Sequence, residues 1–194
     1  LYGTFKFRNH LCLIMKLYKT NLSKFIKKNR IEEDFISKTE AQIRQGLEYI
    51  HNLDIIHCDI KTDNILLKNN NDIVICDFGL VEKCKKGNKV DYSQKQTLWY
   101  RAPEILFSQD FDHSIDYWGL GCILYEMKSG RVLFKVSNDI ELFVLLNVYL
   151  GPPPNLHELK KYHYLYDSIK NPNFVKYRDN IYVFKDTEFK RRNK

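Results

Sequence analysis

The stretch IIHCDIKTDNILL at residues 55–67 places polar side chains between two apolar runs. The apolar flanks are rich in isoleucine and leucine, which favours strands or strand-like segments packed into a core. The residues between them are therefore predicted to form a loop that is held rigidly on both sides. A fold positions catalytic groups in this way. The candidate residues of this loop are Asp59, Lys61, Asp63 and Asn64.

Three of these residues together suit phosphoryl transfer. The Asp59 carboxylate is suited to orient an attacking hydroxyl and to accept its proton. Lys61 is spaced to neutralise charge on the moving phosphoryl group, and the Asn64 amide oxygen to hold a metal ion. One stretch alone is weak evidence, so this hypothesis depends on the rest of the chain.

The composition indicates one globular domain. The chain has 194 residues, of which 44% are hydrophobic and 28% are charged, enough for a sizeable core. No run of 18 apolar residues occurs, so we expect no membrane partner. The net charge of +7 comes from basic residues spread along the chain, which favours a solvated surface over a nucleic-acid partner. The basic residues cluster only in FKRRNK at 189–194. This stretch is interpreted either as a phosphate-binding or nuclear-localisation patch or as a solvated tail.

The five cysteines are odd in number and form no CxxC pair. This pattern indicates reduced, mostly buried thiols rather than a disulfide frame, so we expect the protein in the cytoplasm or the nucleus. The first ten residues lack the apolar core and cleavage site of a signal peptide. They also lack an initiator methionine, and we therefore expect the chain to be a fragment of a longer protein.

Apolar periodicity predicts the elements of the first half of the chain. The run at 11–17 is short enough for a strand, and residues 20–29 carry apolar side chains on one helical face. The spacing over 32–51 suits a helix of about five turns. Two apolar runs joined by KNNND predict a hairpin over 64–79. The polar stretch 82–96 has no clear period and is predicted to be a loop.

The second half is predicted to contain two further helices. Residues 114–128 are apolar nearly all round, so this helix should lie in the middle of the domain. A helix over 138–151 is predicted to begin at Asn138 or Asp139 and to stop at Gly151. PPP at 152–154 breaks the chain. The polar remainder, 155–194, is predicted to be an irregular insert.

Four motifs, of which this loop is the first, follow one another in an order that resembles the eukaryotic protein kinases. HCDIKTDN, at 57–64, resembles the kinase catalytic loop HRDxxxxN with cysteine in place of arginine. DFG at 77–79 matches the metal-binding motif, and APE at 102–104 matches the end of the activation segment. DYWGLG, from Asp116, matches the start of the central helix of the large lobe.

Other stretches narrow the resemblance. TLWYRAPEIL and GRVLFKVSNDIELF resemble the CMGC group, which includes cyclin-dependent, mitogen-activated and DYRK kinases. FRNHLCLIMKLYKTNL and IIHCD look most like the DYRK family. The resemblance implies a mainly α fold with small β-hairpins: a kinase large (C-terminal) lobe with only the last strands of the small lobe. By this resemblance residues 1–18 are the small-lobe remnant and hinge, 19–151 the large lobe, and 152–194 a CMGC-type insert and tail.

The resemblance also implies roles for the loop residues. Asp59 is the expected catalytic base, and Lys61 is expected to contact the transferred phosphate. Asn64 and Asp77 are expected to coordinate the Mg²⁺ that bridges the phosphates of ATP. Thr97 resembles the threonine that hydrogen-bonds the base and the lysine in serine/threonine kinases.

Four residues are expected, again by resemblance, to contact the nucleotide. Met15 falls at the gatekeeper position, and Leu17 and Tyr18 fall in the hinge. Leu66 is expected to pack under adenine. Ordinary core positions are the alternative reading for all four. Asp116 is expected to anchor the backbone of the catalytic loop.

Cys58 stands where most kinases have an arginine that pairs with a phosphorylated activation loop. Because a thiol cannot form that bidentate pair, the active geometry of this loop is predicted not to depend on such a phosphate. The YxY pair of the DYRK family is half present, with Tyr92 at its first position and Gln94 at its second. The resemblance therefore does not carry DYRK-type autophosphorylation to this chain.

The implied activity is that of a serine/threonine protein kinase acting on protein substrates, proline-directed if Arg101 follows the CMGC pattern. No GxGxxG motif, VAIK-type lysine or partner arginine for Glu104 occurs in the 194 residues. We therefore expect this piece alone to bind ATP weakly. A pseudokinase or scaffolding module is one alternative, and a basic nucleic-acid-binding protein is another.

Overall fold

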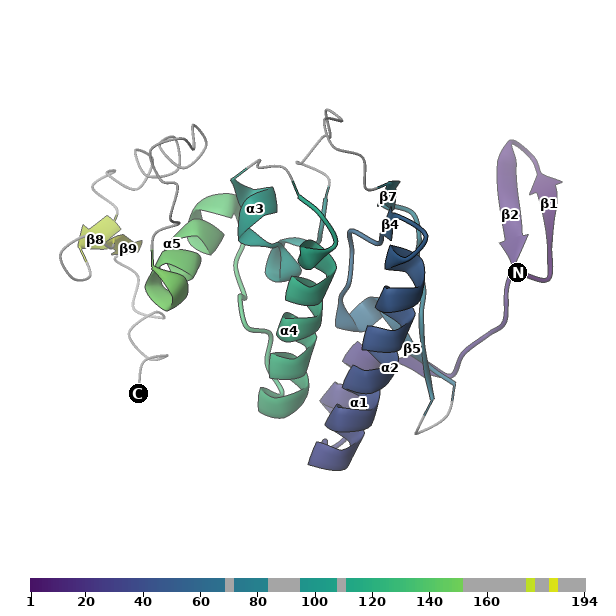
Figure 1. Ribbon diagram of the computed structural model, residues 1–194, viewed down its shortest axis with the longest axis horizontal. Coiled ribbons are helices and arrows are strands. Elements are labelled where there is room, and N and C mark those ends of the chain that lie inside the picture. The colour runs from purple at the N-terminus through teal and green to yellow at the C-terminus, as the bar shows by residue number, and fades with distance from the viewer. Residues whose placement is uncertain (69–71, 84–94, 108–110, 152–173, 177–181, 185–194) are drawn as a thin grey trace.

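The computed structural model describes residues 1–68, 72–83, 95–107 and 111–151, and the backbone of two short strands beyond them. Five α-helices and several small antiparallel sheets make up this part of the chain (Figure 1). The mainly α fold with small β-hairpins is thereby confirmed. The helices are α1 (Leu22–Lys28), α2 (Glu33–His51), α3 (Pro103–Leu106), α4 (Ser114–Ser129) and α5 (Asp139–Leu150).

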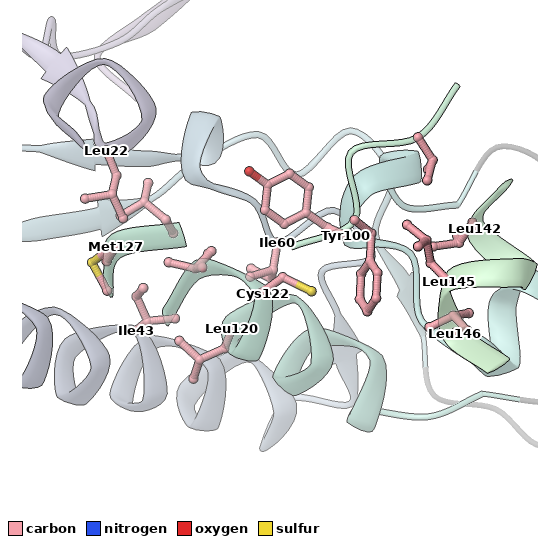
Figure 2. Close-up of a cluster of buried hydrophobic side chains, with 14 of the residues drawn as sticks. Leu22, Ile43, Ile60, Tyr100, Leu120, Cys122, Met127, Leu142, Leu145 and Leu146 are labelled. Atoms are coloured by element: carbon pink, nitrogen blue, oxygen red, sulfur yellow. The ribbon is translucent and has the colours of Figure 1, made fainter. Parts of the chain in front are cut away.

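The main core lies between α2 and α4, which pack side by side (Figure 1). Ile43 and Leu47 of α2 are fully buried, as is Ile123 of α4. Figure 2 shows Leu22 of α1 and Leu142 of α5 at opposite sides of the same cluster of buried side chains. The prediction that the helix over 114–128 lies in the middle of the domain is confirmed, because α4 buries side chains along its whole length.

The hairpin predicted over 64–79 is confirmed. Strand β5 (Ile65–Leu67) pairs with β6 (Ile73–Ile75) in antiparallel register, and β3 (Thr20–Asn21) adds to the other side of β5. Helix α2 packs on β6, where a Cβ atom on Gly46 would lie 2.9 Å from Ile75 Cδ1. This close approach ties the hairpin to the core.

Local capping explains where α5 begins and ends. The Asn138 side chain accepts a hydrogen bond from the backbone N–H of Glu141 at 2.9 Å, which satisfies a free donor of the first turn. Gly151 follows the last turn with a φ of 78°, a conformation that glycine adopts without strain. Both ends agree with the prediction.

Two segments differ from the predictions of loop and irregular structure. Glu82–Lys83 forms strand β7, which pairs with β4 (Ile55–Ile56), so the predicted loop over 82–96 begins with a strand. Residues 84–94 of that loop lie outside the described residues. Beyond residue 154, β8 (Phe174–Lys176) pairs with β9 (Tyr182–Phe184). Strands this short have too few residues for an alternating pattern to reveal them.

Strands β1 (Gly3–Phe7) and β2 (His10–Ile14) form a separate hairpin at the N-terminus (Figure 1). The strand predicted over 11–17 therefore ends three residues earlier. Most large apolar side chains of this hairpin are exposed, among them Phe5, Phe7, Leu11 and Leu13. No helix in the described part of the chain is both long and apolar enough to span a bilayer.

Candidate active site

Asp116 anchors the loop over 55–67 from beneath. Its carboxylate is fully buried at the start of α4 and accepts hydrogen bonds from the backbone N–H groups of His57, at 2.8 Å, and Cys58, at 3.0 Å. His51 at the end of α2 approaches the same carboxylate with Nε2 at 2.9 Å. Hydrogen bonds to a buried carboxylate are among the stronger ones in proteins. The anchoring role expected for Asp116 is thus present in the geometry.

Cys58 adopts a left-handed backbone conformation, with a φ of 62°. Residues other than glycine pay a strain energy there, and such strain persists only where the surroundings impose it. The hydrogen bonds from the His57 and Cys58 N–H groups to Asp116, and from the Gln96 N–H to the Cys58 oxygen, supply that constraint. Burial, together with the charge of Asp116, raises the pKa of the Cys58 thiol to about 12. Cys58 is therefore a structural thiol and not a nucleophile.

The central helix also touches the loop directly at Gly119. A Cβ atom at this position would lie 2.7 Å from the backbone oxygen of Ile60, closer than such atoms approach. Glycine is thus required for α4 to reach the backbone of the loop at this point.

Asp59 lies at the centre of a hydrogen-bonded cluster. Lys61 Nζ is 2.7 Å from Asp59 Oδ2 and donates a second hydrogen bond, of 2.8 Å, to Thr97 Oγ1. Thr97 in turn donates to Asp59 Oδ1 from its hydroxyl, at 2.8 Å, and from its backbone N–H, at 3.1 Å. The Asp59 side chain is 7% exposed, so its orientation is set by these partners more than by water.

Asn64 completes this cluster. Its side-chain nitrogen donates to the backbone oxygen of Asp59, at 2.9 Å, and to Asp59 Oδ2, at 3.1 Å. Because the nitrogen is directed at Asp59, the amide oxygen is the atom of this side chain that can bind a cation. The structure therefore brings together four of the predicted site residues: Asp59, Lys61, Asn64 and Thr97.

Asp77 lies beside this cluster without being hydrogen-bonded to it. The backbone N–H of Cys76 donates to the backbone oxygen of Asn64 at 2.9 Å, which joins the two candidate metal-binding segments. Burial raises the pKa of the Cys76 thiol; the charge of Asp77 raises it too, whereas that of Lys61 lowers it. Both charges are thus close to one side chain. Asp77 has a φ of 66°, and its Oδ1 accepts from the N–H of Gly79 at 3.3 Å.

The donor set of Asn64 and Asp77 fits magnesium. Mg²⁺ prefers hard oxygen ligands and is commonly held by one or two protein groups together with waters and phosphates. One amide oxygen and one exposed carboxylate meet that requirement. Among the described residues, no group of three or more His, Cys, Asp and Glu side chains forms a denser metal site.

Of the four residues expected to contact a nucleotide, two are half-buried and two are exposed. Leu66 is half-buried in the middle strand of the β3–β5–β6 sheet. Met15 and Leu17 are 64% and 93% exposed on the segment between β2 and β3, outside the Asp59 cluster. Tyr18 is half-buried, with Lys16 Nζ 5.8 Å from its ring centroid.

Gln96 is a buried residue of the site that no pattern in the sequence singles out. Its backbone N–H donates to the oxygen of Cys58 at 3.0 Å, and its side chain bonds to the oxygen of Ile115 and the N–H of Ala102. Like Cys58 it has a positive φ, of 55°. Gln96 therefore joins the loop, the segment after Thr97 and the start of α4.

A second polar cluster lies under the segment that follows Thr97. The Tyr100 hydroxyl donates to Glu126 Oε2 at 2.5 Å, and Thr62 Oγ1 donates to the same oxygen at 3.2 Å. Burial raises the pKa of Glu126, and these two hydrogen bonds oppose that rise. Glu126 also lines a cavity of about 700 Å³ between α1, α4 and α5 that includes Asp63 and Trp99.

Comparisons with known proteins agree with this geometry. A family model described as the protein kinase domain matches residues 1–150. The mitogen-activated protein kinase HOG1 of Candida albicans is 38% identical over 142 residues, which cover 73% of this chain and 37% of that protein. Human dual specificity tyrosine-phosphorylation-regulated kinase 3 is 37% identical over 164 residues, 81% of this chain and 27% of that protein. Human cyclin-dependent kinase-like 5 is 31% identical over 154 residues, 78% of this chain and 16% of that protein. The chain thus spans between about a sixth and a little over a third of the length of these relatives.

Proposed function

Because the chain belongs to the protein kinase family and to its CMGC group, we propose that its gene product transfers the γ-phosphoryl group of ATP to serine and threonine hydroxyls of proteins. The observation that carries this proposal is the Asp59 carboxylate held by Lys61 and Thr97. A lysine two residues after the base and a threonine on the facing segment suit an alcohol substrate and a charged phosphoryl group.

Each side chain of the cluster has a separate task in this reaction. Asp59 accepts the proton of the attacking hydroxyl, and Thr97 fixes the direction in which that carboxylate points. Lys61 places its positive charge beside the base, where the transferred phosphoryl group would pass. Asn64 and Asp77 would hold Mg²⁺, which when bound neutralises charge on the phosphates of ATP.

We propose that the cavity that includes Asp63 and Glu126 receives side chains of a protein substrate. It is large enough for several side chains and begins at the loop that carries the base. Proline-directed specificity remains part of the proposal. It rests on the relatives' group and on Arg101, which is held by Asp139 at 2.7 Å and by the Gln96 oxygen at 3.1 Å.

A pseudokinase or scaffolding module is the second candidate. The 194 residues contain no glycine-rich GxGxxG motif, the element that covers the phosphates of ATP in active kinases. For this reason we propose that the isolated chain binds ATP weakly, whereas the full-length gene product is active.

The test is a phosphoryl-transfer assay with labelled ATP on the full-length gene product. Asp59→Asn keeps the shape of the side chain but cannot accept the proton, and should lower kcat by about 10²–10⁴-fold. Asp54→Asn is the matched control, because Asp54 is an exposed acid with a φ of 58° that asparagine also tolerates. Equal activity of Asp59→Asn and wild type would refute Asp59 as the base, whereas no activity in the wild type would refute the enzyme and leave the scaffolding module.

A further inference from the structure

Lys95 is a nearly buried lysine on the segment that leads into Thr97. Its ammonium group lies 2.6 Å from Glu82 Oε1 and donates a hydrogen bond of 3.1 Å to the backbone oxygen of Leu80. The Lys95 side chain is 11% exposed and that of Glu82 is 32% exposed. A lysine rarely gives up this much hydration unless its charge is paired, so the contact is a built feature of the fold.

Glu82 and Lys95 stand at the two ends of the segment 82–95, so their ion pair holds these two ends together. Glu82 belongs to β7, which pairs with β4 immediately before the catalytic loop. Lys95 stands two residues before Thr97, and two residues of chain span about 7 Å at most. The position of the Lys95 backbone therefore limits how far Thr97 can move from Asp59.

Gln96 strengthens the same connection from the opposite side. It bonds to Cys58 through its backbone and to Ala102 through its side chain. Lys95 thus holds residues 95–97 to β7, and the next residue, Gln96, holds them to the catalytic loop. The pKa of the Cys58 thiol is affected by the charges of both Lys95 and Glu82, which places the ion pair next to the residue that replaces the usual arginine.

We propose that Lys95 is a positioning residue for the reaction: its ion pair with Glu82 holds residues 95–97 against the catalytic loop, so that Thr97 reaches Asp59 without a phosphate on the segment. This role rests on the proposed kinase function, because its consequence is the alignment of the base. The clamp itself is a structural arrangement and can be measured separately from catalysis.

The first experiment compares Lys95→Met with wild type in the full-length gene product, using two measurements. The value of kcat should fall about tenfold, the effect of losing one charge-assisted contact, while KM for ATP stays unchanged. Amide hydrogen exchange of the peptide containing residues 95–101 should become at least about tenfold faster. Lys68→Met is the matched control, since its ion pair with Asp72 is 3.8 Å long and both side chains are about half exposed.

A charge reversal separates the ion pair from simple packing. The double variant Lys95→Glu/Glu82→Lys should recover kcat to within about threefold of wild type, whereas each single reversal should not. If Lys95→Met fails to fold, Glu82→Gln takes its place, because Glu82 is the more exposed partner. Unchanged exchange of residues 95–101 in the folded variant would overturn the clamp, whatever the activity. Faster exchange in Lys95→Met, together with a wild-type protein that transfers no phosphate, would support the clamp and refute the kinase function.

Discussion

Thr97 donates two hydrogen bonds to a single oxygen of Asp59, one from its backbone N–H at 3.1 Å and one from its hydroxyl at 2.8 Å. The two residues are 38 positions apart in the chain. A base on one loop is thus oriented by a segment that reaches it only through the tertiary fold. The Asp59 carboxylate therefore points in the right direction only if the segment around Thr97 is correctly placed.

The first prediction concerns the hydroxyl of Thr97. Thr97→Val keeps the shape and the backbone hydrogen bond but removes the acceptor of Lys61 and the donor to Asp59, so kcat should fall about 10- to 100-fold. Thr97→Ser keeps the hydroxyl and should stay within about threefold of wild type. Steady-state kinetics on both variants tests this, and similar losses in the two would assign the effect to packing instead.

The second prediction uses two glycines of the same helix. Gly119→Ala forces a Cβ atom toward the Ile60 oxygen and should lower the free energy of unfolding by about 1–3 kcal/mol. Gly121→Ala meets nothing within 4 Å and should raise it by about 0.5–1 kcal/mol through helix propensity. Urea unfolding measures both. The prediction is wrong if the two substitutions change stability in the same direction.

The third prediction is a pH dependence that arises from Glu126. Since burial holds its pKa in the folded state above the usual value of 4.5, the folded protein binds more protons than the unfolded chain between these two pKa values. Stability contributed by Glu126 is therefore full below about pH 4.5 and is lost as the pH rises through the folded-state pKa. As the pH rises, the wild type should therefore lose stability relative to Glu126→Gln. Urea unfolding of both proteins from pH 4 to 7 measures this difference in stability. A difference that does not change with pH would contradict the assignment.

The fourth prediction concerns thiol reactivity. Burial raises the pKa of both Cys58 and Cys122 to about 12, so at pH 8 only about one thiol in ten thousand is ionised at each. Iodoacetamide should label neither until denaturant is added, whereas the less buried Cys12 should react in the folded protein. Peptide mass spectrometry reads all three sites. Early labelling of Cys58 would contradict its full burial within the catalytic loop.

The sequence predicted the part of the site that is local in the chain. Asp59, Lys61 and Asn64 fall within six consecutive positions, and the apolar runs on both sides indicated a supported loop. Thr97 and Asp77 were reached only through resemblance, because nothing in their own neighbourhood distinguishes them from loop or cap residues. Periodicity indicated α2 well, since a long helix repeats its pattern several times. The nearly continuous apolar character of residues 114–128 indicated α4 and its central place.

The buried polar contacts were not predictable in the same way. Gln96 and Glu126 look like surface residues in the sequence, and their partners lie in segments far along the chain. Pattern reasoning assigns such residues to solvent, because burial of a polar group depends on a partner that only the fold supplies. The opposite error occurs at Met15 and Leu17, whose apolar character indicates burial although both are exposed.

The contact between Gly119 and Ile60 has a consequence for protein engineering. A catalytic loop is often treated as a portable cassette that a designer can graft onto another scaffold. Here the cassette would have to include α4, because the helix offers a bare backbone surface at Gly119 and a carboxylate one turn earlier at Asp116. A host scaffold with an alanine at the equivalent of position 119 would push the transplanted loop outward and turn its base away from the substrate.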